Sequence, residues 1–140
     1  MTTEAENNVS FFRFEDLRIY AKALGYINWV HQATSTFPEN VQASLTNKFV
    51  ITTQTIALHI AEGSARNKSQ FIYYLKMAKS SVRDCVVYTT ISSQMGLFNE
   101  ENTDYSRNQL MELTKMIGSL IASLQRSMPP GKEEDEVDEI

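Results

Sequence analysis

Hydrophobic residues recur at every third or fourth position along most of this chain, the spacing that places them on one face of an α-helix. The first such segment begins beside two acids, Glu15 and Asp16, which suit the positive end of a starting helix. We expect it to run to about Thr36, because Pro38 disfavours helical backbone in the residue before it. Its predicted core stripe is Leu17, Tyr20, Ala21, Leu24, Ile27 and Val30.

A second helix is predicted to begin shortly after Pro38, at Glu39 or Asn40. The run 50–56 is rich in β-branched residues, which favour strands, but the helical apolar spacing continues through it and outweighs this weak preference. Gly63 follows the last apolar position, and we predict that it ends the helix with a positive φ. The stripe of this helix is Leu45, Phe49, Thr52, Ile56 and Ile60.

A third helix follows a short polar link over residues 64–69. Ser69 is the predicted N-cap, and Gly96 is the predicted end. Its apolar stripe is Phe71, Tyr74, Leu75, Ala78, Val82, Cys85 and Thr89.

The fourth helix has Asn99 or Thr103 as its N-cap and ends near Met128, before two adjacent prolines that begin at Pro129. Its stripe is Leu110, Leu113, Ile117, Leu120, Ile121 and Leu124. Four amphipathic helices joined by short links predict an all-α fold, an antiparallel up-down-up-down four-helix bundle.

Composition supports a single globular domain with few helix breakers: 42% of the 140 residues are apolar, 21% are charged, and there are five Gly and three Pro. We expect a flexible N-terminal segment over residues 1–12, the bundle over 13–128, and a disordered acidic tail over 129–140. The net charge of −4 comes from this tail, because residues 132–140 hold six acids and one lysine. The remaining 12 basic and 11 acidic residues leave the rest of the chain close to neutral.

The sequence contains no secretory signal and no uncharged apolar stretch of the ~18 residues that a membrane span needs. We therefore expect a cytoplasmic protein. The lone cysteine, Cys85, cannot form an internal disulfide or a thiolate metal site, and its helical neighbours predict a buried, inert thiol.

Candidate catalytic and metal-binding groups are few. His59 and Glu62 are three residues apart on one helix, but a di-metal bundle needs a second such pair and further acids from the other helices. The only other histidine, His31, has no acid three residues before it. No nucleophile–base arrangement or Gly-rich phosphate loop is present. We predict no metal, no cofactor and no enzymatic activity.

The most informative feature is a set of basic residues on the third helix, with no acid among them before Asp84. On an ideal helix its last three members lie within about 60° of one another, beside the core face. We call this set the basic stripe: Arg66, Lys68, Lys76, Lys79 and Arg83. Such a stripe can follow a phosphate backbone, or it can simply solvate a helix surface, and the sequence leaves both readings open.

Two neighbouring features have a structural and a binding interpretation. Tyrosines on the third helix can stack on nucleobases, but we favour packing at the edge of the core; they are Tyr73, Tyr74 and Tyr88. The joint between the second and third helices contains Glu62, Gly63 and Ser64. We expect Glu62 to pair with Arg66 and Ser64 to satisfy a backbone group, which favours a structural role for the joint.

Three sequence segments resemble a known family. They are Phe14-Glu-Asp-Leu-Arg-Ile-Tyr20, the joint His59-Ile-Ala-Glu-Gly-Ser64 with Arg66, and the pattern Phe71, Leu75, Ala78, Ser81. Together they resemble the four-helix-bundle family of 23S rRNA intervening-sequence proteins, which also includes the accessory variability protein of diversity-generating retroelements. The resemblance implies a small bacterial bundle protein that forms a homo-oligomer, often a ring of five. It also implies association with RNA or with nucleic-acid-handling enzymes, and no known catalysis.

The leading hypothesis is a non-enzymatic, homo-oligomeric bundle that binds RNA, or a protein that handles nucleic acid, through the basic stripe. The alternative is a protein–protein scaffold with no nucleic-acid role. Its interface would use the aromatic positions Phe11, Phe12, Trp29 and Phe98.

Overall fold

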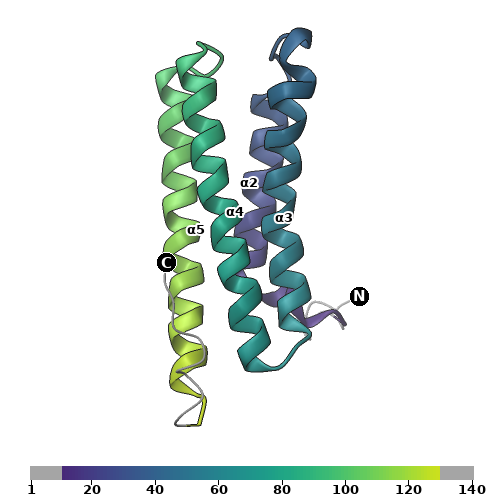
Figure 1. Ribbon diagram of the computed structural model, residues 1–140, viewed down its shortest axis with the longest axis vertical. Helices are drawn as coiled ribbons and strands as arrows, with labels where there is room; N and C mark the ends of the chain where they lie inside the picture. The colour runs from purple at the N-terminus through teal and green to yellow at the C-terminus, as the bar shows by residue number, and fades with distance from the viewer. Residues whose placement is uncertain (1–10, 130–140) are drawn as a thin grey trace, which may run out of the picture.

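Four α-helices lie side by side as an antiparallel bundle in the computed structural model, which describes residues 11–129 (Figure 1). They are α2 (Arg18–Ala33), α3 (Asn47–Ser64), α4 (Lys68–Gln94) and α5 (Glu100–Arg126). Each helix packs against the next along the chain, and α2 also contacts α5. No strand occurs in the described part of the chain. The predicted all-α, up-down-up-down four-helix bundle is confirmed.

The start of α2 differs from the prediction. Glu15 and Asp16 lie in a separate 3-10 turn, η1 (Arg13–Asp16), and extended backbone at Leu17 divides this turn from the helix. At the other end, the Thr34 hydroxyl donates a hydrogen bond to the Val30 carbonyl at 2.8 Å, just after the last helical residue. The helix therefore ends three residues before Thr36.

The chain becomes helical again directly after Pro38, through a 3-10 turn, η2 (Glu39–Val41), and a π-helical turn, η3 (Gln42–Thr46), that lead into α3. The β-branched run 50–56 is helical, as predicted. The helix accommodates its threonines because their hydroxyls donate hydrogen bonds to carbonyls of the same helix. Thr52 donates to the Lys48 carbonyl at 2.7 Å, and Thr53 donates to the Val50 carbonyl at 2.6 Å.

The link between α4 and α5 agrees with the sequence. Gly96 has φ 75°, and the Asn99 side chain accepts a hydrogen bond from the backbone N–H three residues ahead at 2.7 Å. The predicted N-cap of α4 is wrong. Asn67, rather than Ser69, caps the helix and accepts from the N–H three residues ahead at 2.8 Å. The carboxamide oxygen of Asn67 is a strong acceptor that lies two residues before Ser69. The helix therefore begins earlier, and the link from α3 is shorter than predicted.

The core confirms the stripes of α3, α4 and α5 in large part and corrects that of α2. On α2 the predicted Ala21 and Leu24 are exposed, and Leu17, Tyr20 and Ile27 are only partly buried. The buried residues of this helix are Ile19, Ala23, Tyr26 and Val30. This helix carries two adjacent apolar stripes, and hydrophobic spacing alone does not distinguish which of them faces the core.

A buried chain of hydroxyl groups joins three helices at one level of the bundle. The Tyr26 hydroxyl of α2 and the Ser106 hydroxyl of α5 are 2.7 Å apart, and Ser106 is also 2.7 Å from the Thr89 hydroxyl of α4. Thr89 in turn donates to the Cys85 carbonyl at 2.8 Å. Buried hydroxyls need partners, so these bonds fix how α2, α4 and α5 align along the bundle axis.

No helix in the described range is both long and apolar enough to cross a membrane. Apart from Phe11, Phe12 and Pro129, the expected N-terminal segment 1–12 and the expected tail 129–140 lie outside the described residues.

Candidate nucleic-acid interface

The joint between α3 and α4 contains the predicted ion pair. Arg66 donates to the Glu62 carboxylate, and its guanidinium carbon lies 5.3 Å from the centre of the Tyr74 ring. The hydrogen bond to Glu62 raises the pKa of Arg66. Ser64 satisfies a backbone group as expected, by donating to the Ala61 carbonyl at 2.9 Å. Arg66 is therefore engaged within the protein and is the member of the basic stripe least available to a phosphate.

Gly63 has a different role from the one predicted. It lies inside α3, one residue before the helix ends, and Gly96 is the one glycine with positive φ among the described residues. A Cβ at Gly63 would stand 2.6 Å from the Tyr74 Cβ and 2.9 Å from Cδ1 of Phe71. Glycine is required here because α3 and α4 approach too closely for any side chain.

The other four residues of the basic stripe lie on α4. Lys68 is exposed, and its Nζ donates to the Ser127 carbonyl at the end of α5, at 3.4 Å. Lys76 and Lys79 are partly exposed, and Arg83 is exposed. Among the described residues, Lys68, Lys79 and Arg83 form no ion pair with an acid.

The fourth helix adds basic residues that the sequence analysis did not include. The Lys68–Ser127 contact and the Thr89–Ser106 hydrogen bond set one antiparallel register between α4 and α5. In that register the exposed Lys115 stands level with Lys79, and Arg126 stands next to the start of α4. Periodicity within one helix does not reveal such neighbours, because the register depends on buried hydroxyls of two different helices.

Charge is distributed unequally along the bundle axis. The Thr55–Ser81 hydrogen bond, 2.8 Å long, and the Lys22–Glu112 ion pair lie near the middle. Among the described residues, the half that contains the α3–α4 joint, here called the basic half, holds eight basic residues against three acids. The basic residues are Arg13, Arg18, Arg66, Lys68, Lys76, Lys79, Lys115 and Arg126, and the acids are Glu15, Asp16 and Glu62. The other half holds three basic residues and five acids.

The sequence of the chain matches one protein family over most of its length. The model of the family described as 23S rRNA-intervening sequence protein matches residues 15–119, three quarters of the chain. This chain is a member of the 23S rRNA-intervening sequence protein family. The matched span contains α2, α3, α4 and most of α5, including every residue of the basic stripe. No curated protein matches the chain.

The tyrosines of this intervening-sequence family protein divide into two groups. Tyr88 stacks on Phe49, with 5.5 Å between ring centres, and Tyr74 packs between Arg66 and Tyr73. Packing at the edge of the core, which the sequence favoured, therefore holds for Tyr74 and Tyr88. Tyr73 is 57% exposed and is the one tyrosine of the three with a ring open to a ligand.

The aromatic positions named for a scaffold interface are only partly at the surface. Phe98 is buried, and Trp29 is partly buried among Tyr26, Phe98 and Tyr105. These two residues pack against each other at one end of the bundle. Phe11 and Phe12 are exposed.

The residues considered for catalysis include His59 of α3 and Cys85 of α4. Cys85 is buried, as predicted, and burial raises the pKa of its thiol, which keeps it protonated. Burial also lowers the pKa of His59, whose ring lies 6.3 Å from that of Tyr74. In the described residues no three His, Cys, Asp or Glu side chains group closely enough to hold a metal ion.

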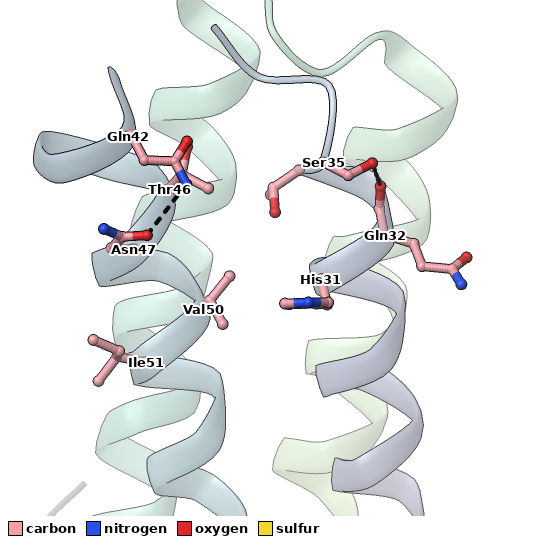
Figure 2. Close-up of a pocket in the computed structure, with 9 residues that line it drawn as sticks. His31, Gln32, Ser35, Gln42, Thr46, Asn47, Val50 and Ile51 are labelled. Carbon is pink, nitrogen blue, oxygen red and sulfur yellow. Dashed lines mark hydrogen bonds between the residues drawn. The ribbon is translucent and has the colours of Figure 1, made fainter. Parts of the chain in front are cut away.

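An uncharged cleft of about 630 Å³ lies between the end of α2 and the start of α3, away from the α3–α4 joint. Figure 2 shows His31, Gln32 and Ser35 on one side and Gln42, Asn47 and Val50 on the other. The Gln42 carboxamide donates to that of Asn47 at 3.4 Å. The buried Thr46 hydroxyl has no partner within the described range. The lining has no fixed charge, so this cleft is separate from the basic half in both place and chemistry.

Proposed function

We propose that this protein is a non-enzymatic, cytoplasmic bundle that binds RNA, or a protein that handles nucleic acid, through the basic half. The members of the basic stripe in this half supply the main contacts, and Lys115 and Arg126 of α5 extend them. Arg83, the last member of the stripe, lies just beyond the middle of the bundle. In this proposal the protein acts as a homo-oligomer, with a ring of five as the arrangement that the family resemblance suggests.

The observation that carries this proposal is the surplus of five positive charges in the half that contains the α3–α4 joint. Lysine and arginine side chains on neighbouring antiparallel helices can follow a phosphate backbone, and the release of counterions then drives binding. Tyr73 offers an exposed ring beside them, on which an unpaired base can stack. The family description, which names an rRNA element, agrees with RNA as the polyanion.

The test is an electrophoretic mobility shift with a structured RNA at low and moderate salt. If four or five phosphates are contacted, log Kd should change with log salt with a slope of about 3 to 4.5. Absence of a complex with RNA or DNA even at low salt would overturn the proposal.

A second candidate, a protein–protein scaffold without a nucleic-acid role, is favoured by a different surface. Several large apolar side chains are exposed on the outer faces of the adjacent helices α3 and α4: Ile51, Leu58, Val87, Ile91 and Met95. The two on α3 are two turns apart, so they lie on one face of that helix. Val87 and Ile91 lie one turn apart on α4, and Met95 follows four residues later as the residue that caps the end of the helix. Exposed apolar faces of this kind are typical of protein interfaces.

The salt dependence of binding distinguishes the RNA-binding function from the scaffold function. Association through apolar side chains persists at high salt, whereas phosphate contacts weaken steeply. Sedimentation of Leu58→Glu and Val87→Glu variants, compared with the parent, tests whether this apolar surface supports assembly. A scaffold role requires that these variants dissociate an assembly that the parent forms.

A further inference from the structure

The basic half lies next to the point where the chain continues beyond the bundle. α5 ends at Arg126, and the carbonyl of the next residue, Ser127, accepts the hydrogen bond from Lys68. Met128 is buried against the bundle. The sequence that follows, 132–140, carries a net charge of −5.

We propose that the basic half binds the chain's own acidic C-terminal sequence, residues 132–140, in competition with nucleic acid. The acids that would contact it are Glu133, Glu134, Asp135, Glu136, Asp138 and Glu139. The binding of this sequence does not depend on the proposed function, whereas the competition does.

The net charge of the basic half and the net charge of residues 132–140 are equal in size and opposite in sign. The basic half has a surplus of five positive charges over its own acids, and residues 132–140 have an excess of five negative charges. Part of the basic surplus is not paired with an acid: in the described range Lys68, Lys79 and Lys115 form no ion pair.

The segment that follows the bundle is long enough to reach the basic residues of α4. An extended chain spans about 3.3 Å or more per residue, so the eleven residues from Pro130 to Ile140 reach about 36 Å. From Lys68 to Arg83 the helix rises only about 22 Å at 1.5 Å per residue. The acids can therefore reach every basic residue of α4 without any movement of the bundle.

The tether makes weak contacts effective. Single exposed ion pairs contribute little, so the free acidic peptide would bind poorly. Covalent attachment through a short linker gives an effective concentration of the order of millimolar, which is enough for several weak pairs to act together. Such contacts are screened by salt, and a long RNA that makes more of them displaces the peptide.

Zero-length carbodiimide cross-linking of the full chain, read by mass spectrometry, tests this proposal directly. At low salt, acids of 133–139 should cross-link to Lys68, Lys76, Lys79 and Lys115 several-fold more often than to Lys48. Lys48 is the control because it is exposed but lies at the start of α3, in the other half. At about 1 M salt, where the screening length is ~3 Å, the preference should disappear.

Two results overturn the proposal. One is cross-linking to Lys48 as often as to the basic half. The other comes from an equal mixture of isotopically light and heavy chains: mixed light–heavy cross-links as abundant as the light–light and heavy–heavy ones together would mean that the sequence binds another copy. Cross-links within single chains support the proposal.

The competition is tested separately with a variant in which all six acids are replaced by Gln or Asn, so that the length is kept. At low salt this variant should bind an RNA hairpin several-fold more tightly than the parent, and at high salt equally. Unchanged affinity at low salt contradicts the competition. If neither protein binds RNA, the proposed function fails, while the cross-linking result on its own still decides whether the acidic sequence binds.

Discussion

Gly63 of α3 and Tyr74 of α4 approach so closely that a Cβ on the glycine would stand 2.6 Å from the tyrosine Cβ. Both atoms are close to their backbones, so relief requires the two helices to separate. Gly63→Ala should therefore lower the free energy of unfolding by about 1–3 kcal/mol, although alanine favours a helix.

The matched control is Gly118→Ala in α5, where nothing lies within 4 Å of the new methyl group. This change should raise the unfolding free energy by about 0.5–1 kcal/mol through helix propensity alone. Urea denaturation of both variants measures the difference. Equal stabilisation by the two substitutions would show that α3 and α4 do not meet at Gly63.

The sequence indicated that Gly63 is important, but it did not reveal why a glycine is needed there. The end of an apolar stripe followed by glycine predicts a cap, and only the approach of a second helix shows that the need is for space. The choice of core face on α2 failed for the same kind of reason: Leu24 is as hydrophobic as the buried Ile19, but the bundle has room for only one of the two stripes. Local signals, such as Asn99 and Gly96 in the α4–α5 turn, were predicted correctly because they act within a few residues.

The candidate site shows the same distinction between local features, which the sequence predicts, and features that depend on how the helices pack. The Glu62–Arg66 pair is local, with its members four residues apart in the chain, and its prediction is confirmed. Lys115 was missed because its place beside Lys79 depends on the register between two helices. The charge asymmetry of the whole bundle was missed because it depends on the direction of every helix, whereas composition alone gives a nearly neutral body.

Neutralising the stripe tests RNA binding. Lys76→Gln/Lys79→Gln should weaken RNA binding to a similar extent for all RNA sequences and lower the salt slope by about 0.7–0.9 for each phosphate that is no longer bound. Adding Arg83→Gln should abolish binding while leaving thermal stability almost unchanged, because exposed charges contribute little to folding.

The control is Lys48→Gln/Arg107→Gln, which removes the same charge from the other half of the bundle. A mobility shift compares the variants. An equal loss of affinity in the control would indicate that net charge, and not the stripe, determines binding. If the stripe variant instead breaks up an oligomer in sedimentation, the stripe is a subunit interface.

The buried hydroxyl chain predicts an unequal pair of effects. Tyr26→Phe removes one hydrogen bond but leaves Ser106 bonded to Thr89, so the expected cost is about 1 kcal/mol. Ser106→Ala leaves the buried Tyr26 hydroxyl without its partner and should cost more, about 1–3 kcal/mol. The double variant should be less destabilised than the sum of the two in denaturant titrations. Additive costs would show that the two hydroxyls do not interact.

Alkaline pH should destabilise the fold. Burial raises the pKa of Cys85 above its ordinary 9.0 and that of Tyr26 above its ordinary 10.0. Above these ordinary values the unfolded chain loses protons that the folded chain retains, so the unfolding free energy falls as pH rises from about 9. Denaturation midpoints from pH 7 to 11 measure this fall. The slope should be smaller in Cys85→Ala, and an equal slope in both would show that the thiol is not protected from ionisation.

In a variant whose six acids over 133–139 are replaced by neutral residues, the unequal halves of the bundle would form an electric dipole. The two halves are centred about 20 Å apart along helices of roughly 40 Å, so a nearby polyanion would exert a torque on this variant as well as an attraction. The α3–α4 joint would turn toward an approaching chain of phosphates before any contact forms, so encounters would be mostly end-on. The rate of association, rather than the lifetime of the complex, would then carry much of the dependence on salt.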